Sequence, residues 1–145
     1  MKLSEDAIRR RLEEWPVARL ATIGPEGRPQ LVPIVFSRVG DSLWSPIDGK
    51  PKSGRELSRV RNIRAHPAVC LLLDEYGADW TQLWWIRIDA TARVVAGDGS
   101  DPLAAAVLAA LRGKYRQYES VPVVGEPPTL LEFRVERMVS WSARV

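Results

Sequence analysis

The stretch SPIDGKPKSGRELSRVRNIRAHP covers residues 45–67, and the rest of the chain is organised around it. It reads as the end of a strand, a turn that contains glycine, and a helix closed by His66 and Pro67. Six of its residues are basic and two are acidic, so the segment is suited to binding an anion. The basic residues are Lys50, Lys52, Arg55, Arg59, Arg61 and Arg64.

The helix in this stretch is predicted to begin at about Gly54, because Ser53 and Glu56 have the spacing of a capping box. Its first N–H groups then point back toward Lys50 and Lys52, and helix N-termini bind anions. One face of this helix carries three polar side chains that are expected to meet the anion: Arg55, Arg59 and Asn62. The alternative is a solvated basic helix that follows a surface loop.

Composition predicts one globular domain over residues 1–145, since 46% of the residues are hydrophobic and 27% are charged. Cys70 is the only cysteine and lies in the apolar run 68–73, so we assign it to the core and expect no disulfide. No apolar run approaches the length that spans a membrane, and no apolar signal region precedes the first helix. We therefore expect a cytoplasmic protein that does not bind membranes.

A two-residue alternation predicts strands at 17–23, 28–37 and 82–95, with a last strand through 131–141. Shorter strands are expected at 42–47, after Gly40 and Asp41, and at 68–74, which is almost continuously apolar. Helical patterns fall at residues 4–15, 54–66 and 101–118, where Asp101 and Pro102 are expected to start the third helix. Short turns join most of the strands. These features predict a mainly β fold with three helices, an antiparallel barrel of six or seven strands rather than a βαβ sheet.

Two strands have features that suggest a role in binding. Pro33 interrupts its strand, which indicates a sheet edge or a bulge where main-chain groups near 32–35 are open to a ligand. The strand at 82–95 directs Trp84 toward the core and places Trp85 and Arg87 together on the other face. That pairing is suited either to stacking on a planar ligand or to a contact between subunits.

The sequence lacks the residues of the common catalytic sites. His66 is the only histidine, and we assign it to the end of a helix rather than to a catalytic triad. The chain shows no cluster of metal-ligand residues, no glycine-rich dinucleotide fingerprint and no P-loop. If the protein is an enzyme, a bound cofactor must therefore supply the chemistry.

Four segments, at residues 18–34, 48–52, 57–67 and 83–88, together resemble the pyridoxamine 5'-phosphate oxidase-like superfamily. The resemblance extends over nearly the whole chain and is greatest to the actinobacterial, PPOX-class branch of flavin and deazaflavin oxidoreductases. It implies a split β-barrel of the FMN-binding type, a homodimer, and a flavin-type cofactor in a groove between the two barrels.

The resemblance also implies where the cofactor binds. Basic residues of the family that hold its phosphate correspond to Lys50, Lys52, Arg55 and Arg59. Main chain beside the ring corresponds to Val32, Pro33 and Ile34 and to Ser45, Pro46 and Ile47, and the other subunit brings Trp84, Trp85 and Arg87. The Arg/His substrate element of true pyridoxamine 5'-phosphate oxidases has no counterpart in 139–145, so vitamin B6 oxidation is not expected.

Two cofactors fit this resemblance. FMN needs one phosphate site, whereas coenzyme F-420 (8-hydroxy-5-deazaflavin) carries a phosphodiester and an acidic tail and needs a longer cationic surface. The six basic residues favour F-420, with hydride passing to a small electron-poor organic substrate. The alternatives are an FMN-dependent oxidoreductase, a flavin or tetrapyrrole carrier without turnover, and a nucleic-acid-binding barrel. The last is disfavoured, because the tryptophans are scattered and the cations are concentrated in one segment.

Overall fold

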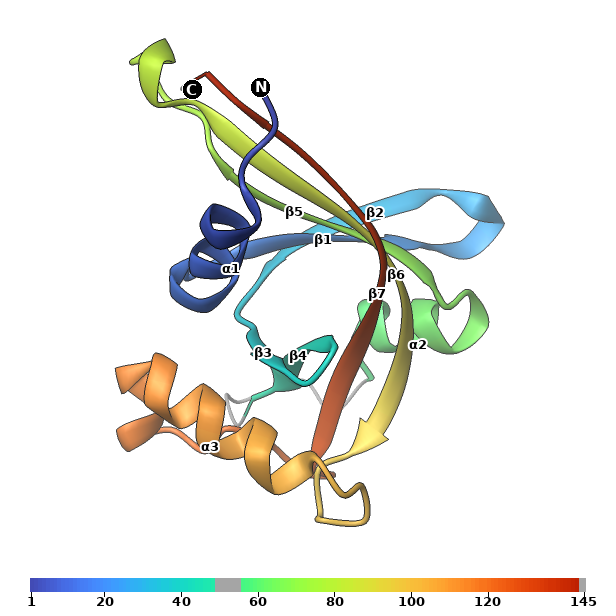
Figure 1. Cartoon of the computed structure of the whole chain (residues 1–145). Coiled ribbons are helices and arrows are strands. Elements are labelled where there is room, and N and C mark those ends of the chain that lie inside the picture. Colours follow the sequence, from blue (N-terminus) through green and yellow to red (C-terminus); the bar gives the residue numbers. More distant parts are fainter. Residues whose placement is uncertain (49–55, 144–145) are drawn as a thin grey trace.

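The structure is a computed structural model and describes residues 1–48 and 56–143. Within this part of the chain, seven antiparallel strands form one sheet that three α-helices accompany (Figure 1). The strands are β1 (Ala18–Ile23), β2 (Pro29–Ile34), β3 (Ser37–Val39), β4 (Ser42–Ile47), β5 (Ala68–Glu75), β6 (Trp84–Ala96) and β7 (Thr129–Ser142). The helices are α1 (Glu5–Glu14), α2 (Ser58–Ala65) and α3 (Ala104–Lys114), and single 3-10 turns occur at Pro25–Gly27, Trp80–Gln82 and Arg116–Glu119.

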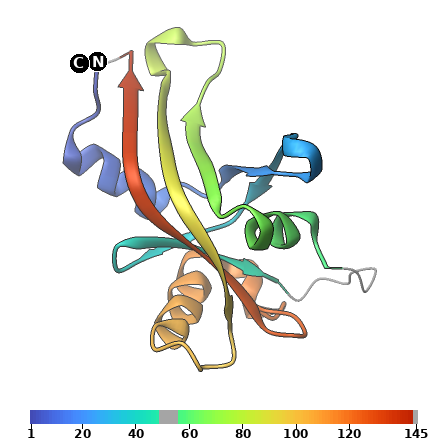
Figure 2. The ribbon, with the colours of Figure 1, turned by 90° about the vertical axis from the view of Figure 1, so that its right-hand side faces the viewer.

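The sheet runs in the order β2-β1-β5-β6-β7-β4-β3 and curls into a split barrel. Two long strands, β6 and β7, bend along their length, so that one end pairs near β5 and the other near β4 (Figure 2). The register between them shifts at Asp89 and Ala90, where a bulge increases the local twist. The sequence prediction of a mainly β, antiparallel barrel is confirmed.

Helix α1 begins and ends where its sequence predicts. The hydroxyl of Ser4 accepts a hydrogen bond from the Ala7 N–H at 3.1 Å and caps the helix. Leu12 is fully buried, and Trp15, directly after the helix, packs edge-on against Trp84 with their ring centroids 4.7 Å apart. The helix therefore covers one end of the barrel core.

Two hydrophobic clusters fill the space around the sheet. The larger one lies inside the barrel between β1, β5, β6 and helices α1 and α2, and it includes Leu20, Leu71 and Ile86, which are completely buried. The smaller one lies under α3, where Val107 and Leu111 pack with Trp44 of β4. Between the two clusters β6 changes its exposure pattern, since Val94 packs against the first cluster and Val95 against the second.

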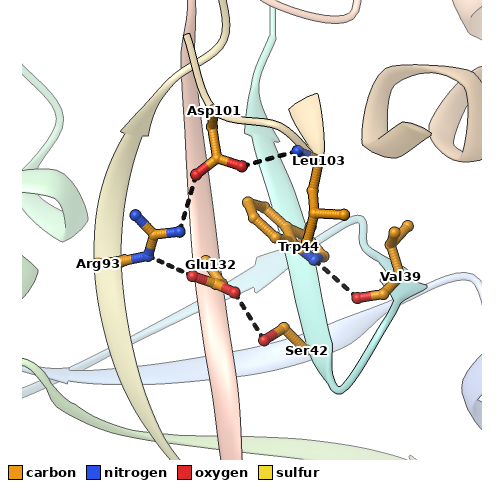
Figure 3. A network of polar contacts seen from close by, with 7 residues as sticks. All are labelled: Val39, Ser42, Trp44, Arg93, Asp101, Leu103 and Glu132. Carbon is orange, nitrogen blue, oxygen red and sulfur yellow. Dashed lines mark hydrogen bonds and ion pairs between the residues drawn. The ribbon is translucent and has the colours of Figure 1, made fainter. Parts of the chain in front are cut away.

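A polar network joins the far ends of β4, β6 and β7 to the start of α3 (Figure 3). The guanidinium of Arg93 pairs with Glu132 and, at 2.9 Å, with Asp101. The hydrogen bond to Glu132, which has the larger effect, and the one to Asp101 both raise the pKa of Arg93. Ser42 donates to the second carboxylate oxygen of Glu132 at 2.8 Å, while Asp101 accepts from the Leu103 N–H at 2.9 Å. The network fixes the corner at which β6 leaves the sheet.

Two helix boundaries differ from the sequence prediction. Helix α2 begins at Ser58 rather than at Gly54, with Leu57 in an extended conformation as its N-cap. Ser53 and Gly54, on which the capping box was predicted, lie outside the described residues. Leu57 packs against the core, and Glu56 pairs with Arg64. Helix α3 begins at Ala104 and ends at Lys114, where Tyr115 adopts an extended conformation and a separate 3-10 turn follows.

The assignment of Cys70 to the core is also wrong. Alternation along β5 directs Val69, Leu71 and Leu73 into the barrel, so Cys70 lies half-buried on the opposite face. Burial and the neighbouring Asp89 both raise the pKa of its thiol.

Candidate functional site

The edge strand β2 carries the first of the predicted main-chain contacts. It ends the sheet on one side, because its only strand partner in the described chain is β1. Pro33 pairs with Arg19 and is exposed at this edge, as its missing N–H requires. Val32 and Ile34 point toward the larger core cluster. The outer edge of β2 therefore has peptide groups that a ligand can contact, while Val32 and Ile34 anchor the strand to the core.

The second predicted main-chain segment is the end of β4. Ser45, Pro46 and Ile47 pair with β7 on one side, whereas β3 pairs with β4 only as far as Trp44. Ser45 is 1% exposed, and the Ile47 carbonyl accepts a hydrogen bond from the Gly125 N–H at 2.9 Å. Beyond Trp44, one edge of β4 lacks a strand partner in the described residues.

Three segments that were predicted to contact a cofactor meet around the same core. Ile34 belongs to the larger cluster, and Val32 from β2, Ile47 from β4 and Leu57 before α2 pack against it. Val60 on the inner face of α2 belongs to this cluster as well. Side chains from β2, the end of β4 and the start of α2 thus border one hydrophobic cluster.

Arg59 lies in the first turn of α2 and has an unusual environment. Its Nε–H is buried and finds no hydrogen-bond acceptor among the described residues. Burial lowers the pKa of the Arg59 guanidinium, and the nearby carboxylate of Asp48 acts in the opposite direction. A buried donor without a partner is costly, so this position suits a bound anion.

Asn62, one turn further along α2, is already engaged within the protein. It is 5% exposed, and its amide nitrogen donates to the Thr22 hydroxyl at 3.0 Å and to the Gln30 side-chain oxygen at 2.7 Å. These bonds tie α2 to the β1–β2 hairpin. In this arrangement Asn62 orients the hairpin relative to Arg59.

Three other predicted phosphate contacts, Lys50, Lys52 and Arg55, lie outside the described residues. Arg61 is exposed on the opposite side of α2 and donates to the Ser58 hydroxyl at 3.2 Å. His66 follows the helix, and its backbone N–H binds the Asn62 carbonyl at 2.7 Å. Its position at the helix end agrees with the sequence assignment.

The predicted contacts on β6 lie on two different faces. Trp84 is 1% exposed, and its indole N–H donates to Glu75 at 3.0 Å inside the barrel end that α1 covers. Trp85 is half-buried on the outer face, with the Arg87 guanidinium carbon 5.8 Å from its ring centroid. Helices α1 and α2 lie on different sides of the barrel in Figure 1, so the Trp84 end is separate from Arg59 within one chain.

A hollow of about 390 Å³ opens on the outer face of the sheet. Its floor is formed by small side chains of β1, β5 and β6, including Ala21 and Ala68, and Cys70 and Asp89 stand beside one another within it. The hollow lies on the same face of β6 as Trp85 and Arg87. Sequence reasoning missed it because it depends on the register between strands.

The C-terminal end of α3 was also missed. Lys114 and Tyr115 contact Phe36, which follows β2 in the chain. The Tyr115 hydroxyl accepts a hydrogen bond from the Phe36 N–H at 3.0 Å and lies 2.9 Å from the carbonyl oxygens of Pro16 and Phe36, which share its proton. Tyr115 therefore holds together the two ends of the β1–β2 hairpin, and no local sequence signal indicates this contact.

Two searches of the described residues give negative results. No set of three or more His, Cys, Asp or Glu side chains in residues 1–48 and 56–143 has a geometry that would hold a metal ion. None of the described helices has both the length and the apolar character needed to span a membrane.

Comparison with known proteins assigns the chain to a family. Residues 4–142 match the family model described as pyridoxamine 5'-phosphate oxidase, and the chain belongs to this family. A search among curated proteins finds no match.

Solved structures show the same fold at low sequence identity. A FAD-binding protein from Mesorhizobium loti is 18% identical with a TM-score of 0.69, covering 97% of this chain and 93% of its own. The haem storage protein HutZ from Vibrio cholerae is 18% identical with a TM-score of 0.69, and the match covers 98% of this chain and 95% of HutZ. An F-420 reductase is 18% identical with a TM-score of 0.59, covering 90% and 94%.

Proposed function

We propose that this protein is an oxidoreductase that binds coenzyme F-420 and transfers hydride to a small, electron-poor organic substrate. When bound, the deazaflavin ring supplies the hydride, and the protein supplies binding, orientation and protection from water. Family membership supports the general role of a flavin-type oxidoreductase or binding protein, and a solved F-420 reductase has the same fold.

The observation that carries this proposal is the buried, unpaired Nε–H of Arg59 at the start of α2. A phosphate oxygen is a suitable acceptor, because charge-assisted hydrogen bonds to guanidinium are strong and are often made by two nitrogens. Leu57 makes no side-chain capping bond, so no side chain of the described residues competes for the first N–H groups of α2. The donors therefore fit the phosphate end of either FMN or F-420.

The edges of β2 and β4 suit the ring end of the cofactor. Peptide groups on these edges have no strand partner within the described chain, and they can bind the polar rim of a tricyclic ring. Pro33 removes one donor, which leaves a gap in the row of N–H groups along β2. The strands are rigid, so bound peptide groups would be preorganised.

F-420 is preferred over FMN because the segment from Lys50 to Arg64 carries six basic residues, more than one phosphate requires. The second candidate is a carrier that binds a flavin or a tetrapyrrole without turnover. Its support is the haem storage protein that shares the fold.

The test is a fluorescence titration of the purified protein with F-420 and with FMN at two salt concentrations. We expect tighter binding of F-420 and weaker binding as salt rises, because exposed cations that meet a polyanion are screened. Equal or tighter binding of FMN would overturn the choice of cofactor. Binding of haem with binding of neither flavin would favour the carrier function.

We also propose that the active form is a homodimer joined through the outer face of the sheet. This face carries partly exposed apolar side chains on adjacent strands: Leu72, Trp85, Val139 and Trp141. In a lone barrel this apolar surface would be exposed to water. A two-fold symmetric contact would bury the same surface on both subunits. The resemblance to the family implies that Trp85 and Arg87 then approach the cofactor of the other subunit.

Light scattering at micromolar concentration tests this assembly, and a monomeric mass would contradict it. Trp85→Ala should weaken cofactor binding more than it lowers the melting temperature. The matched control is Trp80→Ala, since Trp80 is 77% exposed at the tip of the β5–β6 hairpin, away from the strand pairs of this face.

A further inference from the structure

The outer face of β5 and β6 is hollow at one end and bulky at the other. On these strands, the lining of the hollow of about 390 Å³ includes three small outward side chains, Ala68, Cys70 and Thr91. Leu72 and Trp85 stand further along the same face, on the far side of the paired residues Leu71 and Ile88. Cys70 and Leu72 flank Leu71, and Thr91 and Trp85 lie equally far from Ile88 along β6. The hollow end and the bulky end are therefore placed symmetrically about this pair.

Two charged residues of β6 share this symmetry. Arg87 and Asp89 flank Ile88 on the outer face, with Arg87 exposed and Asp89 half-buried in the hollow. Neither forms an ion pair with another described residue. The described residues that line the hollow include two carboxylates, Asp89 and Glu136, and no basic side chain. Charges of opposite sign, without ion pairs in the described chain, thus lie on opposite sides of Ile88.

The charges on this face distinguish between the possible symmetry axes of a dimer. A two-fold axis that lies between two packed sheets sets each residue against its mirror position across the axis. An axis along β5 would set Arg87 against Arg19, because both pair with Leu72 and face outward. An axis along β6 would set Arg87 against itself, whereas an axis that crosses β6 at Ile88 sets Arg87 against Asp89. Of these three axes, only the last joins opposite charges, and like charges across an interface are costly.

We propose that the outer faces of two copies of this chain pack about a two-fold axis that crosses β6 at Ile88. Arg87 of each copy then pairs with the partner's Asp89, and Trp85 of each copy enters the partner's hollow. The inference rests on the homodimer proposed above and specifies its register. Packed sheets lie about 10 Å apart, a gap that an arginine and an aspartate side chain bridge between them.

The hollow is suited to a tryptophan ring. Its alanine side chains, from Ala21 and Ala68, are apolar, and Glu136 adds a carboxylate that the indole N–H can meet. Aromatic rings that fill a pocket of the partner are typical of the residues that carry most of the binding energy at interfaces. The hollow also reaches Pro29 at the start of β2, so this register brings Trp85 toward the strand whose edge is proposed to hold the cofactor ring.

Charge exchange tests this register by sedimentation equilibrium of the full-length protein without cofactor. Arg87→Glu alone or Asp89→Arg alone should raise the dimer Kd about a hundredfold, because each substitution places like charges together twice in a symmetric dimer. The double variant Arg87→Glu/Asp89→Arg restores both pairs with their signs exchanged, so its Kd should return to within about tenfold of the wild-type value. The control is Arg61→Glu, since Arg61 is exposed on α2 and its replacement should leave the Kd unchanged.

A second variant tests the hollow without changing a charge. Ala68 is exposed at the start of β5, so Ala68→Trp leaves the core of the monomer intact and fills the hollow from its own chain. The partner's Trp85 is then excluded, and the Kd should rise at least about tenfold. The matched control is Ala105→Trp, because Ala105 is exposed on α3 and its replacement should leave the Kd unchanged. Melting temperatures establish that each variant is folded.

Recovery of the dimer in the double variant, together with a weakened dimer in Ala68→Trp, supports the register. Single charge variants that dimerise like the wild type, or a double variant as weak as the single ones, would overturn the register while the homodimer stands. A wild-type Kd in Ala68→Trp would also overturn it. A monomeric wild type would overturn both the register and the homodimer, and the flavin titration would still decide the cofactor independently.

Discussion

Replacing Asn62 by alanine should destabilise the fold rather than remove a ligand contact. The change deletes two hydrogen bonds of a 5% exposed amide, each worth about 1 kcal/mol net. It also leaves the Thr22 hydroxyl, which is 4% exposed, without its partner, whereas the exposed Gln30 amide returns to water. The expected loss of unfolding free energy is about 2–3 kcal/mol, or roughly 8 °C in melting temperature for a chain of this size.

The assay is thermal and urea unfolding of Asn62→Ala beside Gln30→Ala, which removes only the exposed partner and should cost about 0.5 kcal/mol. Equal, small losses in the two variants would refute the view that the buried amide secures α2 to the hairpin. Weakened cofactor binding with unchanged stability would instead return Asn62 to the direct contact that its place on the helix predicts.

Tyr115→Phe should cost about 2 kcal/mol of stability, because it leaves the Phe36 N–H without its hydrogen-bond acceptor. Tyr118→Phe should cost under about 0.5 kcal/mol, since the Tyr118 hydroxyl makes no hydrogen bond with the described residues. Urea unfolding of the two variants tests this difference. Lys114→Met should stabilise the protein at pH 7 by about 1 kcal/mol, after discounting for partial exposure. Because the folded pKa of Lys114 lies below the unfolded value, wild-type stability is lost as pH falls from 10.5 to about 8, so the advantage of the methionine variant should shrink as pH rises through that window. A variant advantage that stays constant between pH 7 and 10.5 would contradict this linkage.

Much of the fold could be predicted because local patterns and tertiary packing agree. The strand predicted after Gly40 and Asp41 matches β4 at its observed bounds, Ser42–Ile47, and Pro33 marked an edge strand. The start of α2 was predicted too early. Leu57 is extended and packs against the core, so the helix begins only after it, and a capping pattern in the sequence does not show this tertiary contact. Cys70 was wrongly assigned to the core because residues 68–73 are all apolar, so the sequence does not show which of these side chains face the core and which face outward.

The candidate site was predictable only where it depends on charge along one segment. Arg59 and Asn62 were found by their helical spacing, but their different roles depend on Thr22 and Gln30, which lie 30 to 40 residues away in the chain. Lys114 and Tyr115 were missed for the same reason, since the packing of α3 against the β2–β3 connection creates their environment. Contacts of this kind carry no local signature.

The central claim is that Arg59 forms a specific phosphate site, and the most direct measurement compares cofactor affinity in Arg59→Ala and Arg61→Ala. Each charge-assisted hydrogen bond is worth about 1.5–3 kcal/mol, so Arg59→Ala should raise the Kd roughly tenfold to a hundredfold. Arg61 is exposed and directed to Ser58, so its removal should raise the Kd less than about threefold. Equal losses of affinity in the two variants would show that only diffuse positive charge matters and would contradict the site.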